Sequence, residues 1–381
     1  MDNRLARAIA LFWIGTLAVS VADWGLAWVR GILLVVFAAV AAWMTTARSQ
    51  PPDEAASAQV LKSVWLIVLA APHLIWFAIR WLDPHPLFID IGTTTIDATR
   101  AILHGGDPYS LPIDPQADPT MQRFDGFKYT PMTALAYLPL IALLGGQGGL
   151  LLTNLLLDIG VAAAVWRLAA RLGGRAAGRL GVLFYLSLLV VPAQLFQHGV
   201  TDFVATLPLL IALACYDVAP ALAGFCIGLS IAAKPPAGLL LAAYCLPRRG
   251  RVRYVLGCVA GMVPVFVFLV RSGRAMIDNT IVFNLVRPTQ STAWLNALPG
   301  FVGTGVKVVA LAVLLAIAVG VLLRNPSPFA RCALATIGLI IIILVGPGAH
   351  TNYLLWWMPM FCALLAAFLL RPAPVDDLRT A

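Results

Sequence analysis

Apolar runs long enough to cross a membrane recur along most of the chain. A helix of about 20 apolar residues matches the hydrocarbon thickness of a bilayer. The runs occupy residues 5–22, 25–43, 61–82, 148–170, 180–197, 201–217, 253–270, 303–323, 331–347 and 351–370. The pattern predicts an all-α, polytopic integral membrane protein.

Two apolar stretches are interrupted and do not fit a simple crossing. Residues 131–147 contain two prolines and end in glycines, which favours a short re-entrant or interfacial helix after the preceding polar loop. Residues 220–247 are broken by "AAKPPAG", which favours two half-helices meeting at Lys234. With these two assignments the chain makes about twelve crossings and both termini are cytoplasmic.

Composition and charge support the same class. The chain is 61% hydrophobic and 11% charged, whereas a soluble domain carries about 25% charged residues. The net charge of +9 is concentrated in short arginine-rich connections such as 171–179 and 248–253. Positive charge in such connections marks the cytoplasmic side of a membrane protein, and it does not indicate nucleic-acid binding.

The predicted organisation is a single transmembrane domain over residues 1–381 in the cell membrane. Residues 1–60 form an N-terminal helical hairpin, read as an uncleaved anchor, and a cytoplasmic loop. Residues 61–370 form the core, and 371–381 a cytoplasmic tail. The loop at 83–130 contains seven aspartates and is expected outside the cytoplasm. The six cysteines show no metal-binding spacing or disulfide pattern, so we expect no metal and no cofactor.

Polar residues gather in three segments predicted to face the extracytoplasmic side, and Lys234 joins them if the half-helix assignment holds. An ionisable residue within the bilayer costs roughly 2.5–3.5 kcal/mol, so its presence usually has a functional reason. The segments are 90–131 with Asp90, Asp97, His104, Asp107, Tyr109, Lys128 and Tyr129; 194–203 with His198 and Asp202; and 346–359 with His350 and Asn352.

Structural roles compete with functional ones at several of these positions. Asp90 suits a general base at the membrane surface, but it also suits the cap of the helix that "TTTIDATRAIL" predicts. Asp107 lies in "GGDPY", a turn pattern that needs no chemistry. His350 at a helix end is typical of an interfacial histidine.

Five segments in order resemble a known family. They are "RAILHGGDPYS" (100–110), "FKYTPMTALAYLPL" (127–140), "FQHGVTDFVATLPLLIAL" (196–213), "GLSIAAKPPAGLLLAAYCL" (228–246) and "GPGAHTNYLLWWMP" (346–359). Together they resemble the polyprenyl-phosphate-dependent glycosyltransferases of the GT-C class, and most closely the actinobacterial mannosyltransferases of glycosyltransferase family 87. The chain departs from the family pattern at threonines 93–95 and by having His198 and Asp202 in place of glutamine and asparagine.

The resemblance implies a GT-C-like fold and an inverting transfer of a sugar, expected to be mannose, on the extracytoplasmic face. The partners would be a polyprenyl-phosphate sugar donor, a glycolipid or polysaccharide acceptor, and membrane lipids. Asp90 would be the general base, with Asp97 as its rival. Lys128, Lys234 and Arg287 would bind the donor phosphate. The remaining substrate contacts would come from His104, Asp107, Tyr109, Tyr129, His198, Asp202, His350 and Asn352.

Three other functions remain open from the sequence. An arabinofuranosyltransferase would use the same kind of donor. A secondary transporter also has broken helices, although it usually carries an internal repeat, and none is visible here. A non-enzymatic membrane scaffold would need neither a base nor a phosphate site.

Overall fold

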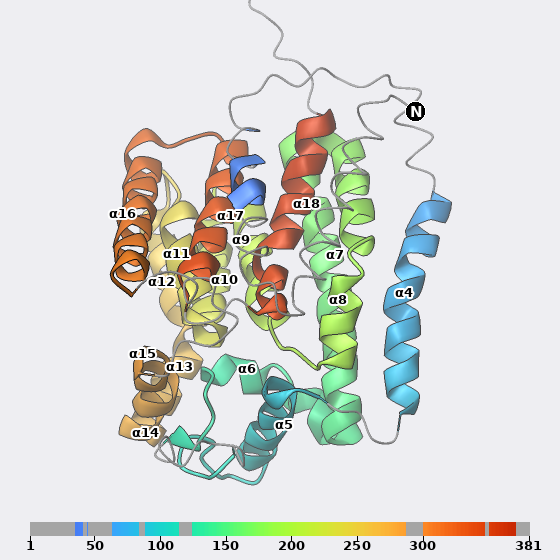
Figure 1. The fold of residues 1–381 in the computed structure, drawn as a ribbon, viewed down its shortest axis with the longest axis vertical. Helices are drawn as coiled ribbons and strands as arrows, with labels where there is room; N and C mark the ends of the chain where they lie inside the picture. Colours follow the sequence, from blue (N-terminus) through green and yellow to red (C-terminus); the bar gives the residue numbers. More distant parts are fainter. Residues whose placement is uncertain are drawn as a thin grey trace, which may run out of the picture.

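The computed structural model describes residues 35–40, 44, 63–83, 88–113, 124–286, 300–346 and 350–370, and their regular elements are all helical (Figure 1). The all-α expectation is therefore confirmed for this part of the chain. The helix predicted at 5–22, most of the one at 25–43, and Arg287 lie outside the described residues.

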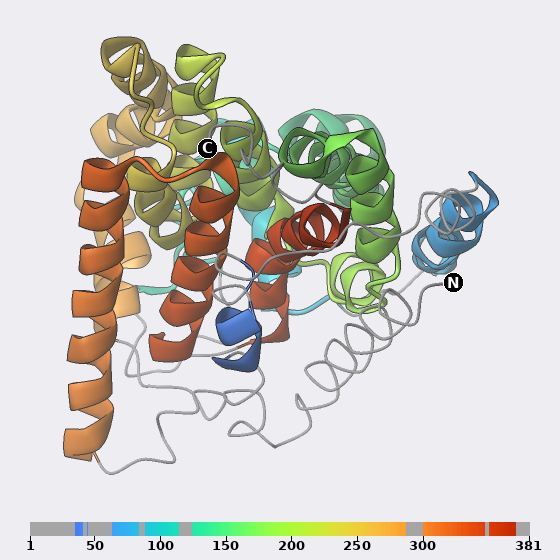
Figure 2. The ribbon, with the colours of Figure 1, turned by 90° about the horizontal axis from the view of Figure 1, so that it is seen from above.

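Long helices run along the longest axis of the molecule (Figure 1). They are α4 (Ser63–Leu82), α7 (Leu138–Leu186), α16 (Gly300–Arg324), α17 (Pro328–Val345) and α18 (Leu354–Leu370). α4 and α16 lie at opposite edges in both views, with α18 between them (Figures 1 and 2). The short helices α5 (Asp90–Leu103) and α6 (Pro131–Leu135) cover one end of the bundle.

The described residues contain four helices that are long and apolar enough to cross a membrane, or five if a bent pair counts as one span. The four are α7, α16, α17 and the stretch Thr351–Leu370. The pair is α12 (Arg251–Gly261) and α13 (Val263–Ser272), bent by 42°. α16 also exposes large apolar side chains along its length, including Phe301, Leu311 and Leu323. Such a surface suits lipid contact, but the predicted count of twelve crossings is not reached by these residues.

Interruptions of the helices explain part of the difference between the twelve predicted crossings and the four or five candidate spans. α7 is kinked at Gly145 (φ 76°) and Gly174 (φ 87°), a backbone conformation that glycine adopts readily. Residues 131–147 therefore form α6 and a separate short helix at 138–144. At 1.5 Å per residue, each of these is about 10 Å long or less, too short to cross a bilayer. Their placement at the membrane interface remains a prediction.

The helix expected at 180–197 is shorter than predicted. It ends at Leu186 and is followed by the single turn α8 (Val190–Pro192) and the π-turn η3 (Ala193–Gln197). Pro192 cannot donate a backbone hydrogen bond, which favours interruption of a regular helix here. The chain then turns at residues 198–202 and enters α9 (Phe203–Cys215).

α10 (Pro220–Ala233) and α11 (Pro235–Tyr244) form a hairpin broken at Lys234, as predicted. Lys234 has φ −143° and ψ 88°, outside the helical region, and Pro235 and Pro236 open α11. α11 folds back onto α10, since a Cβ added at Gly238 would lie 2.5 Å from the amide nitrogen of Ile231. The hairpin therefore begins and ends at the same end of the bundle.

α10 packs on α12 through two pairs of glycines spaced four residues apart. A Cβ at Gly224 would clash with the carbonyl oxygen of Tyr254, and a Cβ at Gly228 with that of Cys258. In return, Gly257 and Gly261 lie against the carbonyl oxygens of α10. Small residues at this spacing allow two helix backbones to approach closely.

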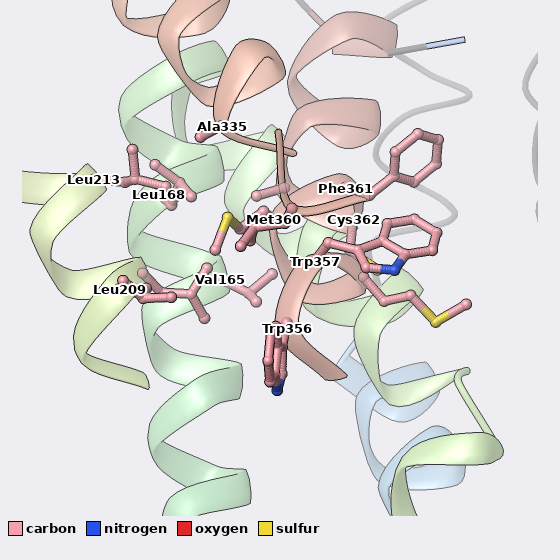
Figure 3. Packing of buried hydrophobic residues seen from close by; sticks show 14 of the residues in the cluster. Val165, Leu168, Leu209, Leu213, Ala335, Trp356, Trp357, Met360, Phe361 and Cys362 are labelled. Atoms are coloured by element: carbon pink, nitrogen blue, oxygen red, sulfur yellow. The ribbon is translucent and has the colours of Figure 1, made fainter. Parts of the chain in front are cut away.

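The apolar core lies where α18 packs against α7, α9 and α17. Figure 3 shows Val165 and Leu168 of α7 beside Leu209 and Leu213 of α9, with Met360 and Cys362 of α18 close by. Trp356 lies apart from the other labelled side chains, and its indole nitrogen points away from them (Figure 3). α18 therefore extends from the apolar core to a polar region at Trp356.

The remaining short elements lie on the side of α5 and α6. They are α14 (Arg274–Ile277), η4 (Asp278–Val282), α15 (Phe283–Val286) and η6 (Thr351–Tyr353). At the other end, Tyr216 lies between two cations, since the guanidinium carbons of Arg171 and Arg331 are each 4.8 Å from its ring centre. Arg331 also donates to the carbonyl oxygens of Tyr244 and Leu246, which ties the end of α11 to the start of α17.

Candidate functional site

A completely buried carboxylate, Asp202, gathers side chains from three distant parts of the chain. Its Oδ1 accepts hydrogen bonds from Lys234 Nζ at 2.9 Å and from Trp356 Nε1 at 2.5 Å. Its Oδ2 accepts one from Asn352 Nδ2 at 2.9 Å. Together with the ring of Tyr129, these residues are called the Asp202 cluster below. The sequence predicted all of its members except Trp356.

Lys234 reaches the Asp202 cluster from the break between α10 and α11. Its side chain is 7% exposed, and its Nζ lies 5.0 Å from the ring centre of Tyr129 and 5.8 Å from that of Trp356. Burying a charge is costly unless it is paired and hydrogen-bonded. Here the ammonium and carboxylate neutralise each other, and the two aromatic faces add cation–π attraction.

The turn at 198–202 places Asp202 at the start of α9. Gly199 supplies a positive φ of 68°, and the Asp202 carbonyl oxygen accepts from the amides of Ala205 and Thr206. The Thr206 hydroxyl also donates to the carbonyl oxygen of Leu355, which ties α9 to α18. The position of the carboxylate is therefore fixed by backbone contacts as well as by its side-chain partners.

Asn154, in the middle of α7, holds the same turn from the other side. Its Nδ2 donates to the carbonyl oxygens of Leu195 at 2.8 Å and Val200 at 3.2 Å. Its Oδ1 accepts from the Tyr137 hydroxyl at 2.6 Å. We did not single out Asn154 from the sequence, although an amide inside an apolar run was the available signal.

Asp90 begins α5 next to the 198–202 turn. The amide of Ile89 donates to the carbonyl oxygen of His198 at 3.1 Å, and a Cβ at Gly92 would lie 3.0 Å from the Gly199 carbonyl oxygen. The Asp90 side chain is exposed, and its Oδ1 accepts from the amide of Ile91 at 2.8 Å. The N-cap position is occupied by Ile89, and no side chain caps the helix, so the expected capping role of Asp90 is wrong. The exposure leaves the carboxylate accessible to a substrate.

Asp97, the rival base, lies on the same exposed face of α5. Seven residues are almost two full turns, so the two carboxylates are about 10 Å apart along the helix axis. Asp97 forms an ion pair with Arg100 at 3.6 Å. Partial burial raises its pKa above the usual value, against the lowering effect of Arg100. A raised pKa favours proton abstraction near neutral pH, so the structure leaves both candidates in place.

The residues at the end of α5 do not join the Asp202 cluster. Asp107 accepts from the Tyr109 amide at 3.0 Å, the Ser110 hydroxyl at 2.8 Å and the Ser272 hydroxyl at 2.7 Å. These contacts are those of a turn that is tied to the end of α13. His104 ends α5 and is exposed. Tyr109 is buried, and its hydroxyl donates to the Tyr129 carbonyl oxygen, so it supports the cluster indirectly.

Three further predicted residues lie close in sequence or space to the cluster. Lys128 precedes Tyr129, is half-buried, and donates to the Gly126 carbonyl oxygen at 3.1 Å. His198 belongs to the turn that carries Asp202. The ring centre of His350 is 5.7 Å from that of Tyr353, which in turn lies 4.9 Å from that of Trp356.

A second buried polar group was missed by the sequence analysis. His73 of α4 has its Nδ1 2.6 Å from Asp158 Oδ2 and its Nε2 3.3 Å from the Leu186 carbonyl oxygen. The hydroxyl of Tyr185 donates to Asp158 Oδ1. All three side chains are buried, and they join α4 to both halves of α7.

No metal site is found among the described residues, where no three His, Cys, Asp or Glu side chains gather closely enough to hold an ion. The six cysteines are free.

Comparisons with known proteins give one structural likeness. No family model matches the chain, and no curated protein matches it. The crystal structure of ArnT from Cupriavidus metallidurans in the apo state aligns with 81% of this chain and 76% of that one. The TM-score is 0.40 and the sequence identity 14%. A likeness at this level does not define the family or the activity of this chain.

Proposed function

We propose that this protein is an integral-membrane glycosyltransferase that uses a polyprenyl-phosphate-linked sugar. More particularly, we propose a mannosyltransferase of the GT-C class, resembling family 87, that acts on a glycolipid or polysaccharide acceptor. One observation carries the proposal. The exposed carboxylate of Asp90 begins a helix whose first turn is docked onto the 198–202 turn, and that turn carries the buried Asp202 cluster.

In this proposal Asp90 takes the proton from an acceptor hydroxyl. The acceptor oxygen bonds to the anomeric carbon as the bond from that carbon to the phosphate oxygen breaks, with inversion. The electron pair of the broken bond leaves with the polyprenyl phosphate. A phosphate already stabilises the resulting charge, so the step needs no metal, and a nearby cation lowers the barrier further.

Lys128 is our assignment for that cation, and Arg287 keeps its proposed role beside the same phosphate. Lys128 is half-buried next to Tyr129. Lys234 was expected to share this role, but its charge is already balanced by Asp202 at 2.9 Å. We therefore assign Lys234 to the Asp202 cluster and treat that cluster separately below.

The membrane-exposed helices suit a lipid-borne donor. α12 and α13 carry exposed apolar side chains, including Val255, Leu256 and Phe266. α13 is joined to the loop after α5 by the contact between Ser272 and Asp107. A prenyl chain lying along α13 would therefore bring its phosphate to the end of the bundle that carries Asp90.

The test is transfer of a labelled sugar from polyprenyl-phosphate mannose to membrane acceptors in vesicles containing the full chain. Asp90→Asn keeps the size of the side chain and an oxygen that can accept from the Ile91 amide, but removes the base. We expect normal abundance and a loss of about 10²- to 10⁴-fold in the transfer rate. Asp97→Asn is the matched control on the same helix face and should retain most activity.

Two outcomes would change the assignment. Collapse in Asp97→Asn with turnover in Asp90→Asn would move the base to Asp97. Transfer from polyprenyl-phosphate arabinose, and not from the mannose donor, would make the protein an arabinofuranosyltransferase. Absence of transfer from either donor in the unmutated protein would contradict the proposed class.

A secondary transporter is the second candidate, favoured by the hairpin of α10 and α11. Broken helices that meet at a polar residue often bind the substrate or ion of a transporter. Lys234 and Asp202 would then be the ion-coupled site. Acceptor-independent uptake of a solute into sealed vesicles, lost in Lys234→Met, would support this function over sugar transfer.

A further inference from the structure

Four hydroxyls in the segments that carry the Asp202 cluster are buried and have no hydrogen-bond partner within the described residues. Nine buried side-chain atoms lack a partner within the described residues, and four of them are the hydroxyls of Thr130, Thr201, Ser230 and Thr351. Each adjoins a cluster residue in the chain. Thr130 follows Tyr129, Thr201 precedes Asp202, and Thr351 precedes Asn352. Ser230 lies one helical turn before Lys234, whose amide donates to the Ser230 carbonyl oxygen at 2.7 Å.

Other buried threonines in the bundle show that this is not the rule for the chain. The hydroxyls of Thr99, Thr153 and Thr336 each donate to the carbonyl oxygen four residues earlier, at 2.7 to 2.9 Å. An unpaired buried polar group costs free energy, so a group of them calls for an explanation such as water or a ligand. Four such hydroxyls in the segments that carry the Asp202 cluster indicate a ligand that offers several hydrogen-bonding groups.

The charge of the cluster selects between two kinds of ligand. Lys234 and Asp202 cancel, so the cluster has no net charge to attract a phosphate. A phosphate would also lie close to the Asp202 carboxylate and be repelled by it. A neutral polyol meets no such penalty, because hydroxyls both donate and accept and the rings of Tyr129 and Trp356 offer apolar faces.

We propose that the Asp202 cluster and these four hydroxyls form the subsite for the uncharged sugar of the donor, while the phosphate binds outside it. This inference rests on the proposed function and specifies which part of the lipid each group recognises. Lys234, Asn352 and Tyr129, three members of the Asp202 cluster, would contact the sugar. Asp202 itself is a positioning residue, because it is fully buried and accepts hydrogen bonds from Lys234, Asn352 and Trp356.

The experiment compares two lipids that differ only in the sugar. Affinities of the full chain in detergent are measured for polyprenyl phosphate and for polyprenyl-phosphate mannose, in the unmutated protein and in Thr201→Val and Thr351→Val. Each variant should bind the sugar-bearing lipid about tenfold more weakly, the effect of one lost hydrogen bond. Both should bind polyprenyl phosphate as tightly as the unmutated protein does.

The melting temperature gives an independent readout, because it should not fall in these variants although their affinity for the sugar-bearing lipid does. Replacing an unpaired buried hydroxyl by a methyl group removes a desolvation cost, so the melting temperature of each variant without lipid should stay the same or rise. Thr336→Val is the matched control, because that hydroxyl is buried but paired on α17. It should melt at a lower temperature and bind both lipids normally.

Three results would overturn the inference. Equal loss of affinity for both lipids would assign the hydroxyls to the phosphate or to the fold. A lower melting temperature in Thr201→Val and Thr351→Val would show that these hydroxyls have partners in the folded protein. Unchanged affinity for the sugar-bearing lipid would remove them from the site. Failure of the unmutated protein to bind either lipid would instead contradict the proposed function itself.

Discussion

Asp158 and Asp202 are the two buried aspartates of the described residues, and each lies within hydrogen-bonding distance of a basic side chain. Asp158 lies 2.6 Å from His73 and Asp202 lies 2.9 Å from Lys234. They differ in their surroundings. Asp158 joins neighbouring parts of α4 and α7, whereas Asp202 joins the broken hairpin to the segment before α18. We therefore assign a structural role to the first and a role at the site to the second.

This assignment predicts a particular pattern of stability for His73 and Asp158. Asp158→Leu leaves His73 and Tyr185 buried without their acceptor, and should lower the free energy of unfolding by about 3–5 kcal/mol. The double variant His73→Leu with Asp158→Leu removes both members of the pair and should recover most of that loss. Unfolding in mixed micelles measures both. If the double variant loses as much free energy of unfolding as Asp158→Leu does, or more, the structural role is contradicted.

At the scale of single residues, the sequence identified polar positions but not their partners. Asp202, Lys234 and Asn352 were predicted because each interrupts an apolar pattern. Their hydrogen bonds join residues separated by 32 and 150 positions, and local patterns carry no information about such pairings. Trp356 was missed as a site residue because an indole in an apolar helix is indistinguishable from a core residue.

At the scale of elements, the crossing of α10 and α12 depends on glycine. The backbones meet so closely at Gly224, Gly228, Gly257 and Gly261 that a Cβ at any of these positions would clash with a carbonyl oxygen. This contact also fixes the hairpin that presents Lys234, because α10 is its first arm. The spacing was visible in the sequence, but the partner helix was not.

Gly224→Ala should therefore destabilise the protein by about 1–3 kcal/mol, the usual cost of forcing extra atoms into a packed contact. Gly305→Ala on α16 is the matched control, since no atom lies within 4 Å of its added Cβ. The control should be neutral or stabilising by up to about 1 kcal/mol, because alanine favours helix. Thermal unfolding of the two variants tests this, and equal melting temperatures would show that the crossing is not tight.

Helix boundaries were predicted less well than helix existence. The helix expected at 180–197 ends at Leu186. The connection expected at 171–179 is present, because the backbone leaves the helical region at Gly174 (φ 87°, ψ 176°). The helices on either side of Gly174 pack against each other, since a Cβ added at Gly181 would lie 3.0 Å from the Cβ of Ala169. The break at Lys234 was predicted correctly, because two consecutive prolines leave no alternative to a new helix start.

At the scale of the whole molecule, the two ends of the bundle differ in chemistry. One end carries α5, α6 and the Asp202 cluster. The other carries the arginines around Tyr216 and the connection at 247–250. This difference between the two ends agrees with the orientation predicted from the charges of the loops, in which the arginine-rich end is cytoplasmic. Which side of the membrane each end faces remains a prediction.

Cysteine labelling tests that orientation. Ser110→Cys and Arg249→Cys lie at exposed positions in the loops of opposite ends. In intact cells, and with the native cysteines replaced, a membrane-impermeant maleimide should label position 110 at once. It should label position 249 only after the membrane is permeabilised. Labelling of both from the outside, or of position 249 alone, would contradict the proposed orientation and with it the extracytoplasmic site.

The pairing of Lys234 with Asp202 also constrains how the chain is built into the membrane. Burying either charge alone would be costly, because a buried charge without its partner is not compensated. Asp202 precedes Lys234 by 32 residues, so the carboxylate is synthesised before the tip of the hairpin. Burial of that tip is therefore coupled to its counter-ion, so the hairpin and the start of α9 must be brought together before either charge is buried.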